Sequence, residues 1–227
     1  MKIAVLGTGI VGNALATKLV QIGNEVTMGS RSANNEAAQK WASSLGERAR
    51  TTTFRDAAAF GELVISCTGG MHSMEALQSV GAEPLRTKIL IDVSNPLQQG
   101  KDGSMILGFC NTDSLGERIQ RAFPQTRVVK ALNTVNCDIM VEPYRVPGDH
   151  NLFICGNDPG RQEKGGRIFA RVVRLETGQH HRPRRYHRCV WHGDDDAALD
   201  ATFSGCNRSP ALQLPYRPRP IMLRVSA

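Results

Sequence analysis

Residues 2–19 read KIAVLGTGIVGNALATKL, a stretch that decides the fold. An apolar, β-branched run leads into GTGIVG at residues 7–12, and an Ala- and Leu-rich helical pattern follows at once. The first glycine permits a tight turn, the second lets the backbone approach a pyrophosphate, and the third lets helix pack on strand; the helix N-terminus offers free N–H groups. The order predicts a dinucleotide-binding turn, against the alternative of a glycine-rich structural turn. The candidate residues are Gly7, Thr8, Gly9, Ile10, Val11 and Gly12.

Short apolar runs and helical patterns continue to alternate up to residue 156. Short apolar runs are expected as strands at residues 2–7, 25–29, 63–67, 88–93, 127–132 and 151–155. Patterns with apolar residues three and four apart are expected as helices at residues 10–23, 34–46, 73–81 and 113–123. Strand, helix and strand in repetition predict a doubly wound α/β fold, a parallel sheet covered on both faces. We expect residues 1–158 to form this Rossmann-like domain.

The second expected strand ends in Ser30 and Arg31, where NAD-binding domains usually carry a carboxylate for the ribose 2′-hydroxyl. A carboxylate would repel a 2′-phosphate, whereas a guanidinium attracts one and a serine hydroxyl can donate to it. The pair therefore predicts selectivity for NADP(H), against the alternative that Arg31 is a solvated residue at a helix start.

Three further strand ends carry small or polar residues. In an open parallel sheet the ligand lies beyond the carboxyl ends of the strands, so these residues are candidates to line the cofactor site. A plain turn remains the alternative at the first two ends, and the third is expected to form a floor under the nicotinamide ring. The residues are Thr68 and Gly69, then Asn95 and Pro96, then Asn133, Thr134 and Val135.

No general acid, nucleophile or metal cluster stands out at these ends. His72 is isolated and reads as a helix-start residue, and Cys67 has no evident basic partner, so we expect an inert thiol. Direct hydride transfer between two stacked rings needs positioning more than acid–base residues, because the cofactors carry the chemistry. We therefore nominate no catalytic residue and no metal.

Length and composition set outer bounds. The chain has 227 residues, 41% of them hydrophobic, enough for one ordinary core. No apolar run approaches the ~20 residues that span a bilayer, and the N-terminus lacks the order of a signal peptide, so a cytoplasmic protein without a membrane segment is expected. The six cysteines are scattered without a CxxC pair, which favours neither disulfides nor structural zinc.

The net charge of +7 is confined to one end of the chain. Residues 1–160 carry 15 basic and 15 acidic residues, whereas residues 161–227 carry 13 and 6. This arginine- and proline-rich tail, residues 159–227, shows little periodicity and is expected to be irregular.

Taken together, MKIAVLGTGIVGNALATKLVQIGNEVTMGSRS, VISCTGG, LIDVSNPL, VVKALNTVN and LFICGND resemble the NADP-dependent oxidoreductases of the coenzyme F420 (8-hydroxy-5-deazaflavin) family. The stretches run in order over residues 1–158. The resemblance implies hydride transfer between NADPH and the deazaflavin, with Thr8, Ser30 and Arg31 on the NADP side and residues 133–136 where the two rings meet. It also implies a small-molecule redox acceptor and a homodimer in the intact family. Ferric or flavin reductases use related domains, so the acceptor stays open.

The resemblance stops after residue 158, where the family continues with segments like Trp-Phe-Gly-Trp, Asp-Leu-Gly-Asp-Ile and Phe-Asn-Phe. Residues 172–175, 182–186 and 212–214 can each be encoded so that reading one base later yields these three segments, in family order. We therefore expect a change of reading frame near residues 159–162, so that the tail was not selected as protein and the acceptor region is missing. The chain would then bind NADPH without efficient catalysis.

Two other interpretations of the tail are weaker. Its arginines, Arg182, Arg184, Arg185 and Arg188, could contact phosphates, but no nucleic-acid recognition motif accompanies them. The trio of His187, Cys189 and His192 fits no standard zinc spacing. We expect neither a nucleic-acid partner nor a metal there.

Overall fold

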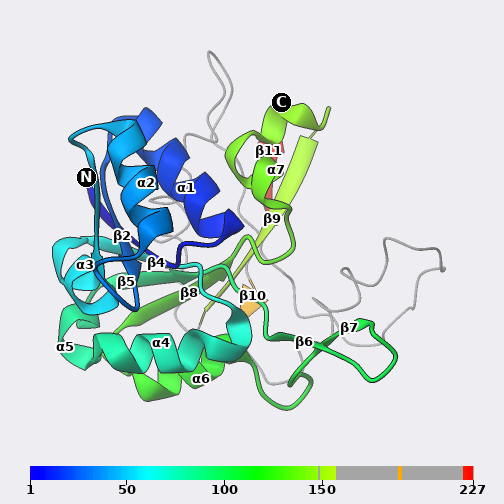
Figure 1. Ribbon diagram of the computed structural model, residues 1–227. Coiled ribbons are helices and arrows are strands. Elements are labelled where there is room, and N and C mark those ends of the chain that lie inside the picture. Colours follow the sequence, from blue (N-terminus) through cyan, green and yellow to red (C-terminus); the bar gives the residue numbers. More distant parts are fainter. Residues whose placement is uncertain (148, 157–188, 191–221, 227) are drawn as a thin grey trace.

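The computed structural model describes residues 1–147, 149–156, 189–190 and 222–226. Its central sheet has the strand order β10-β9-β8-β5-β4-β1-β2-β3, and β11 also pairs with β9. Helices cover both faces of the sheet (Figure 1). The chain reverses its direction of winding at β1, between β2 and β4. The predicted doubly wound α/β fold is confirmed, with the switch point where such folds bind ligands.

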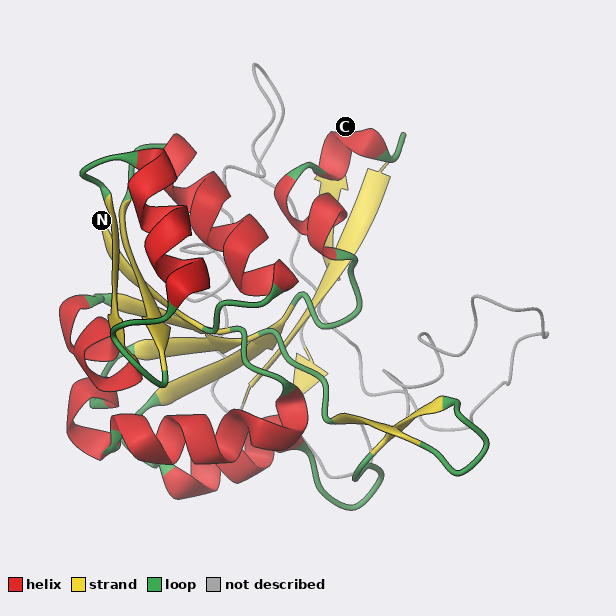
Figure 2. Cartoon of the chain, viewed as in Figure 1, coloured by secondary structure: helices red, strands yellow, loops and turns green. Residues whose placement is uncertain are grey.

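The predicted elements form close to their expected places (Figure 2). The strands are β1 Lys2–Leu6, β2 Glu25–Ser30, β4 Leu63–Ser66, β5 Ile89–Asp92, β8 Arg127–Ala131 and β9 Asp149–Gly156. The helices are α1 Ile10–Gln21, α2 Glu36–Leu45, α4 Ser73–Val80 and α6 Leu115–Ala122. Caps fix several boundaries: the Asn35 side chain accepts from the backbone N–H of Ala38, and Ser114 and Glu117 form a capping box.

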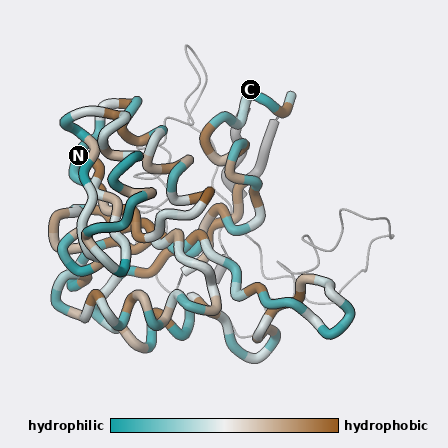
Figure 3. The backbone as a smooth tube through the Cα atoms, viewed as in Figure 1, coloured by the Kyte–Doolittle hydropathy of each residue, from teal (hydrophilic) through white to brown (hydrophobic). Residues whose placement is uncertain are grey.

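The core consists of two layers, one on each face of the sheet. Alternate residues of a strand enter opposite layers, so Ile3 and Val5 pack with α1 and α2, whereas Ala4 and Leu6 pack with the helices of the other face. Figure 3 shows hydrophobic segments along the central strands. Because both faces are covered, these strands are nearly continuous in apolar residues, which made them readable from the sequence.

Several shorter elements were not predicted. They are β3 Ala49–Thr53, α3 Phe54–Phe60, η1 Gly70–His72, α5 Ala82–Leu85, β6 Leu97–Gln99, β7 Met105–Leu107, α7 Cys137–Val141, η2 Pro143–Arg145, β10 Cys189–Val190 and β11 Met222–Ser226. The strand β3 is mostly threonine and lies at the sheet edge, where little apolar surface is buried. The pair β6 and β7 forms a separate two-stranded ribbon that projects from the domain (Figure 1).

One predicted strand departs from the parallel arrangement. The strand β9 runs antiparallel to β8, with Lys130 opposite Cys155. The two strands are joined by residues 132–148, which include α7 and η2. Because the pairing is antiparallel, β9 begins at the end of the sheet where β8 finishes.

Most of the arginine-rich tail lies outside the described residues, including the arginines at 182–188 and, of the trio weighed above as metal ligands, His187 and His192. Within the described part, β10 pairs with β9 in parallel and β11 pairs with it in antiparallel fashion. These two strands were not expected from the sequence.

Candidate functional site

Five strand ends lie side by side at one edge of the sheet. The strands β2, β1, β4, β5 and β8 are consecutive neighbours and mutually parallel, so their carboxyl ends meet at this edge. The sequence-predicted site residues lie at or just after the ends of these five strands, or within the first turn of α1. The fold thus brings together stretches that are up to 128 residues apart in the sequence, from Gly7 to Val135.

Two glycines of the first turn are required by the fold. Gly7 has a φ of 121°, and a Cβ there would lie 2.6 Å from the carbonyl oxygen of Cys67. A Cβ on Gly12 would lie 2.1 Å from the carbonyl oxygen of Gly7. Any side chain at these two positions would push α1 and β4 away from the turn. These glycines would therefore be needed even in a purely structural turn.

Gly9 is different. Its φ of −72° and ψ of −176° are extended backbone that any residue adopts. In the part of the chain that the structure describes, no heavy atom lies within 4 Å of the position of a Cβ on this residue, neighbours excluded. Nothing in the described fold requires glycine there. A side chain at residue 9 would obstruct only something that approaches from outside.

The start of α1 is open to solvent and suited to an anion. The helix has no side-chain cap at its N-terminus and no acidic residue in its first turn. Its first backbone N–H groups lack partners within the helix, and the helix dipole favours negative charge at this end. Thr8 is half-buried, Val11 packs partly against the core, and Ile10 is 80% exposed. An isoleucine this exposed would be covered by any ligand lying across the turn.

At the end of β2, Ser30 and Arg31 have different environments. Ser30 is 4% exposed, and its hydroxyl donates to the backbone oxygen of Ser32 at 2.5 Å. A role for Ser30 as donor to a phosphate stays a prediction, and it would require this hydroxyl to turn away from Ser32. Arg31 is exposed and forms no hydrogen bond or ion pair with any other residue that the structure describes. Its guanidinium is available to a ligand at this end of the row.

The end of β4 is tied to both of its neighbours. Besides the contact of Gly7 with Cys67, a Cβ on Gly70 would lie 2.0 Å from the carbonyl oxygen of Asn95. Thr68 and Gly69 therefore lie between the β1 turn and the β5 end, with Thr68 half-buried and Gly69 exposed. Burial raises the pKa of the Cys67 thiol, and the nearby Asp92 carboxylate adds to this effect. The thiol is held in its unreactive form, in agreement with the expectation of an inert cysteine.

The ends of β5 and β8 are joined by two amide side chains. The Asn95 Nδ2 donates to the backbone oxygen of Asn133 at 2.7 Å, and the Asn133 Nδ2 donates to Asn95 Oδ1 at 3.3 Å. The preceding residue, Leu132, is 2% exposed and has a φ of 65°. A bulky residue in the left-handed region costs about 1–3 kcal/mol and persists where the surroundings hold it, which is common at ligand sites. Thr134 and Val135 follow half-buried, and Pro96 is buried.

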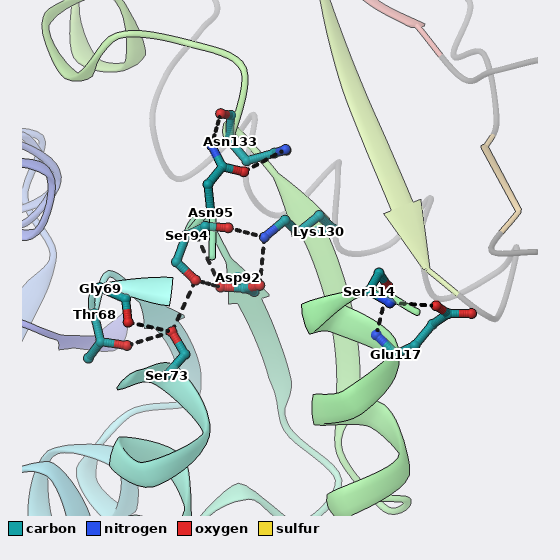
Figure 4. A network of polar contacts seen from close by, with 10 residues as sticks. All are labelled: Thr68, Gly69, Ser73, Asp92, Ser94, Asn95, Ser114, Glu117, Lys130 and Asn133. Atoms are coloured by element: carbon teal, nitrogen blue, oxygen red, sulfur yellow. Dashed lines mark hydrogen bonds and ion pairs between the residues drawn. The ribbon is translucent and has the colours of Figure 1, made fainter. Parts of the chain in front are cut away.

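A buried ion pair beneath this site was missed by the sequence analysis. Lys130 Nζ lies 2.8 Å from Asp92 Oδ2, with the Asp92 side chain fully buried and the Lys130 side chain 11% exposed. Lys130 also donates to the backbone oxygen of Ser94 (Figure 4). The signal was present as Asp in ILID and Lys in VVKA, each a charged residue inside a buried apolar strand. Charges in such strands are usually paired.

Other candidates stay at the margin of the site. The His72 side chain is 78% exposed, 3.9 Å from Glu75, and lies in η1 directly before α4. Among the described residues, no three His, Cys, Asp or Glu side chains gather as metal ligands do. In the same part of the chain, no helix has the length and apolarity to cross a membrane.

Comparison with known proteins gives the family. The family sequence model described as "NADP oxidoreductase coenzyme F420-dependent" matches residues 2–96. The F420-dependent NADP reductase of Methanothermobacter marburgensis is 35% identical over 152 residues, which are 63% of this chain and 67% of the relative. The chain belongs to the coenzyme F420-dependent NADP oxidoreductase family. Members of this family are NADP-dependent oxidoreductases that use NADP(H) and coenzyme F420, as the first resemblance implied.

Two other relatives extend the comparison. A solved structure from Arthrobacter sp. FB24, assigned as an F420-dependent NADP reductase, is 42% identical, with a TM-score of 0.70 over 76% of this chain and 81% of that one. The metalloreductase STEAP3 of Rattus norvegicus is 30% identical over 156 residues, 69% of this chain. This match spans only 29% of the rat protein, so the likeness concerns one domain of it.

Proposed function

We propose that the five strand ends form an NADP(H) site and that the chain derives from an enzyme transferring a hydride between NADPH and a deazaflavin or flavin-like acceptor. The observation that carries the proposal is Gly9, a glycine which the described fold does not require. The open helix start beside it suits a pyrophosphate, and the backbone at Gly9 leaves the path to that helix free. A turn of purely structural use would not explain this position.

In this proposal each strand end has one task. Gly9 and the first turn of α1 bind the pyrophosphate, and Arg31 at β2 binds the 2′-phosphate of the adenosine ribose. Thr68 and Gly69, with Asn95 and Pro96, line the path towards the nicotinamide. When bound, NADPH supplies the hydride.

Residues 133–135 form the floor on which the reacting rings meet. The amide bonds between Asn95 and Asn133 hold this floor at a fixed distance from the β5 end. The protein's contribution to hydride transfer is then positioning, since no acid, base or nucleophile is needed at the reacting carbon.

The acceptor is proposed from the relatives. The archaeal relatives are named as F420-dependent, which favours the deazaflavin. The rat relative is named as a metalloreductase, which keeps a ferric or flavin reductase as the alternative. The two proposals differ only in the molecule that occupies the space beyond residues 133–135.

We also propose that residues 1–158 form the NADP(H)-binding domain and that the reading frame changes near residues 159–162. In support, the matches to the archaeal relatives cover only 63% of this chain. The chain as written would then bind NADPH and turn over poorly. Sequencing the gene across the codons for residues 155–167 separates the two origins of such a change. One added or missing base means that the true protein carries the family's C-terminal region, whereas an unaltered frame means a truncated relative with a foreign tail, for which NADPH binding without efficient catalysis is expected.

The function is tested in two steps with the chain as written and with a frame-restored version. Dissociation constants for NADPH and NADH are measured first, and tight, NADPH-selective binding by both proteins is expected. NADPH oxidation is then followed with coenzyme F420, FMN or a ferric chelate as acceptor. Fast turnover with coenzyme F420 by the restored protein is the expected result. Binding without turnover on any acceptor would contradict the enzyme proposal and leave a dinucleotide-binding module.

A further inference from the structure

A continuous row of side chains connects the surface at Thr68 with the buried ion pair (Figure 4). Thr68 Oγ1 lies 2.8 Å from Ser73 Oγ, which lies 3.1 Å from Ser94 Oγ. The Ser94 hydroxyl donates to Asp92 Oδ1 at 2.6 Å. Ser73, Ser94 and Asp92 are buried, whereas Thr68 is half-buried at the sheet edge. The row thus runs from a buried end at Asp92 to a half-buried end at Thr68.

Asp92, at the buried end of the row, fixes the direction of the hydrogen bonds. A carboxylate can only accept. Asp92 accepts from Lys130 Nζ, from the Ser94 hydroxyl and, at 3.1 Å, from the Ser94 backbone N–H. The single hydroxyl proton of Ser94 is therefore directed at Asp92, and the Ser94 oxygen can only accept from Ser73.

The same reasoning applies at each step outward. Ser73 donates its one proton to Ser94, so it must accept from Thr68. The other acceptor near Ser73, the backbone oxygen of Gly69, is farther away at 3.4 Å. If Ser73 donated there, two oxygens 3.1 Å apart would share no proton, and the buried Ser94 oxygen would lose a bond. Thr68 therefore points its proton inward and presents only lone pairs outward.

Thr68, at the other end of the row, faces the proposed cofactor site. Thr68 lies between the glycine turn and Asn95, because Gly7 contacts the backbone of Cys67 and Thr68 while Gly70 contacts Asn95. This is the part of the row between the pyrophosphate site and residues 133–135. In the proposed binding mode, the groups of NADPH nearest to this region would be the ribose hydroxyls and the carboxamide of its nicotinamide half, which all carry hydrogen-bond donors.

We propose that Asp92, held by Lys130, orients Ser94 and Ser73 so that Thr68 acts as an obligatory hydrogen-bond acceptor for a donor on the nicotinamide half of NADPH. The inference rests on the proposed NADP(H) site. Thr68 touches the ligand, whereas Ser73, Ser94, Asp92 and Lys130 are positioning residues. The row favours ligands with a hydroxyl or amide N–H at this place over ligands that offer only an acceptor.

The test compares two ligands. NADPH reaches Thr68, whereas adenosine 2′,5′-bisphosphate carries only the adenosine end and does not. We expect Thr68→Val to weaken NADPH binding about five- to tenfold, the worth of one uncharged hydrogen bond, and to leave binding of the bisphosphate unchanged. Thr68→Ser should restore NADPH affinity to within about twofold of wild type, because the serine keeps the hydroxyl.

Ser73→Ala tests the direction of the row. Without Ser73 the Thr68 hydroxyl is free to turn, so NADPH binding should weaken about threefold, and the double variant with Thr68→Val should be no weaker than Thr68→Val alone. Equal NADPH affinity in wild type and Thr68→Val, or equal losses for both ligands, would overturn the acceptor role. Additive effects of the two substitutions would overturn the coupling. A wild type that binds NADPH, with an affinity that Thr68→Val leaves unchanged, overturns this inference alone, whereas a wild type that does not bind NADPH overturns the proposed function as well.

Discussion

The two ends of the proposed cofactor site are built in opposite ways. At β2, Arg31 is exposed and has no hydrogen-bond or ion-pair partner among the described residues. At β5 and β8, Asp92 and Lys130 are buried and paired, and Asn95 and Asn133 bond to each other. The open end offers a charge to a ligand, whereas the closed end uses its polar groups within the protein. A substitution at the open end should therefore change specificity, and one at the closed end should change stability and geometry.

Lys130→Met should give the largest effect, because it leaves the Asp92 carboxylate buried without its counter-charge. We expect the free energy of unfolding to fall by about 3–5 kcal/mol, measured by urea denaturation. The double variant Asp92→Asn with Lys130→Met should recover more than half of this loss. Lys101→Met, at an exposed position in the turn between β6 and β7, is the control. A loss below about 1 kcal/mol for Lys130→Met would show that the closed end is not held by charge.

Arg31→Glu should change selectivity without changing stability. It replaces an attraction for the 2′-phosphate by a repulsion, so NADPH binding should weaken about 100-fold while NADH binding changes little. Lys101→Glu makes the same change in net charge far along the chain from β2 and should leave both affinities unchanged. An unaltered NADPH-to-NADH preference in Arg31→Glu would remove Arg31 from the site.

Asn95→Ala sharpens the description of the closed end. It removes both bonds to Asn133, so the free energy of unfolding should fall by about 1–1.5 kcal/mol. Asn133→Ala keeps the 2.7 Å bond, because the acceptor is the backbone oxygen of residue 133, and should cost less than half as much. Equal losses in the two variants, measured by denaturation, would mean that the backbone bond does not hold the β5 and β8 ends together.

The smallest expected effect concerns Cys67. Burial and the Asp92 carboxylate raise its pKa, so the folded thiol stays protonated where an unfolded thiol ionises. Stability from this group is complete below the ordinary thiol pKa of about 8.5 and falls as the pH rises above it. Peptide mass spectrometry after iodoacetamide treatment at pH 8 should show slow labelling of Cys67 in the folded protein and rapid labelling in urea. Rapid labelling in the folded state would contradict the inert thiol.

The glycine turn and β2 could be located from the sequence more directly than the contacts between β5 and β8. GTGIVG and the Ser30-Arg31 pair are local patterns whose meaning follows from their distance along the chain, so the turn and its strand could be read directly. The bonds of Asp92 to Lys130 and of Asn95 to Asn133 each join residues 38 positions apart. Such pairs depend on which strands become neighbours, and no local pattern states that.

Some elements were missed for a related reason. Strands buried on both faces, such as β1 and β4, are marked by continuous apolar runs, whereas the threonine-rich β3 at the sheet edge is not. The antiparallel β9 was read correctly as a strand, but its direction was not predicted, because the direction depends on how the chain returns to the sheet through α7 and η2.

Gly9→Ala tests the central claim most directly, because the claim is that this glycine serves a ligand and not the fold. The account predicts a free energy of unfolding within about 1 kcal/mol of wild type, since the described fold leaves room for the methyl group. It also predicts NADPH binding weakened by about 30-fold or more, since the methyl group stands where the pyrophosphate approaches. Gly12→Ala should instead destabilise the fold itself, because its Cβ would meet the Gly7 oxygen at 2.1 Å. NADPH affinity equal to wild type in a stable Gly9→Ala protein would contradict the account.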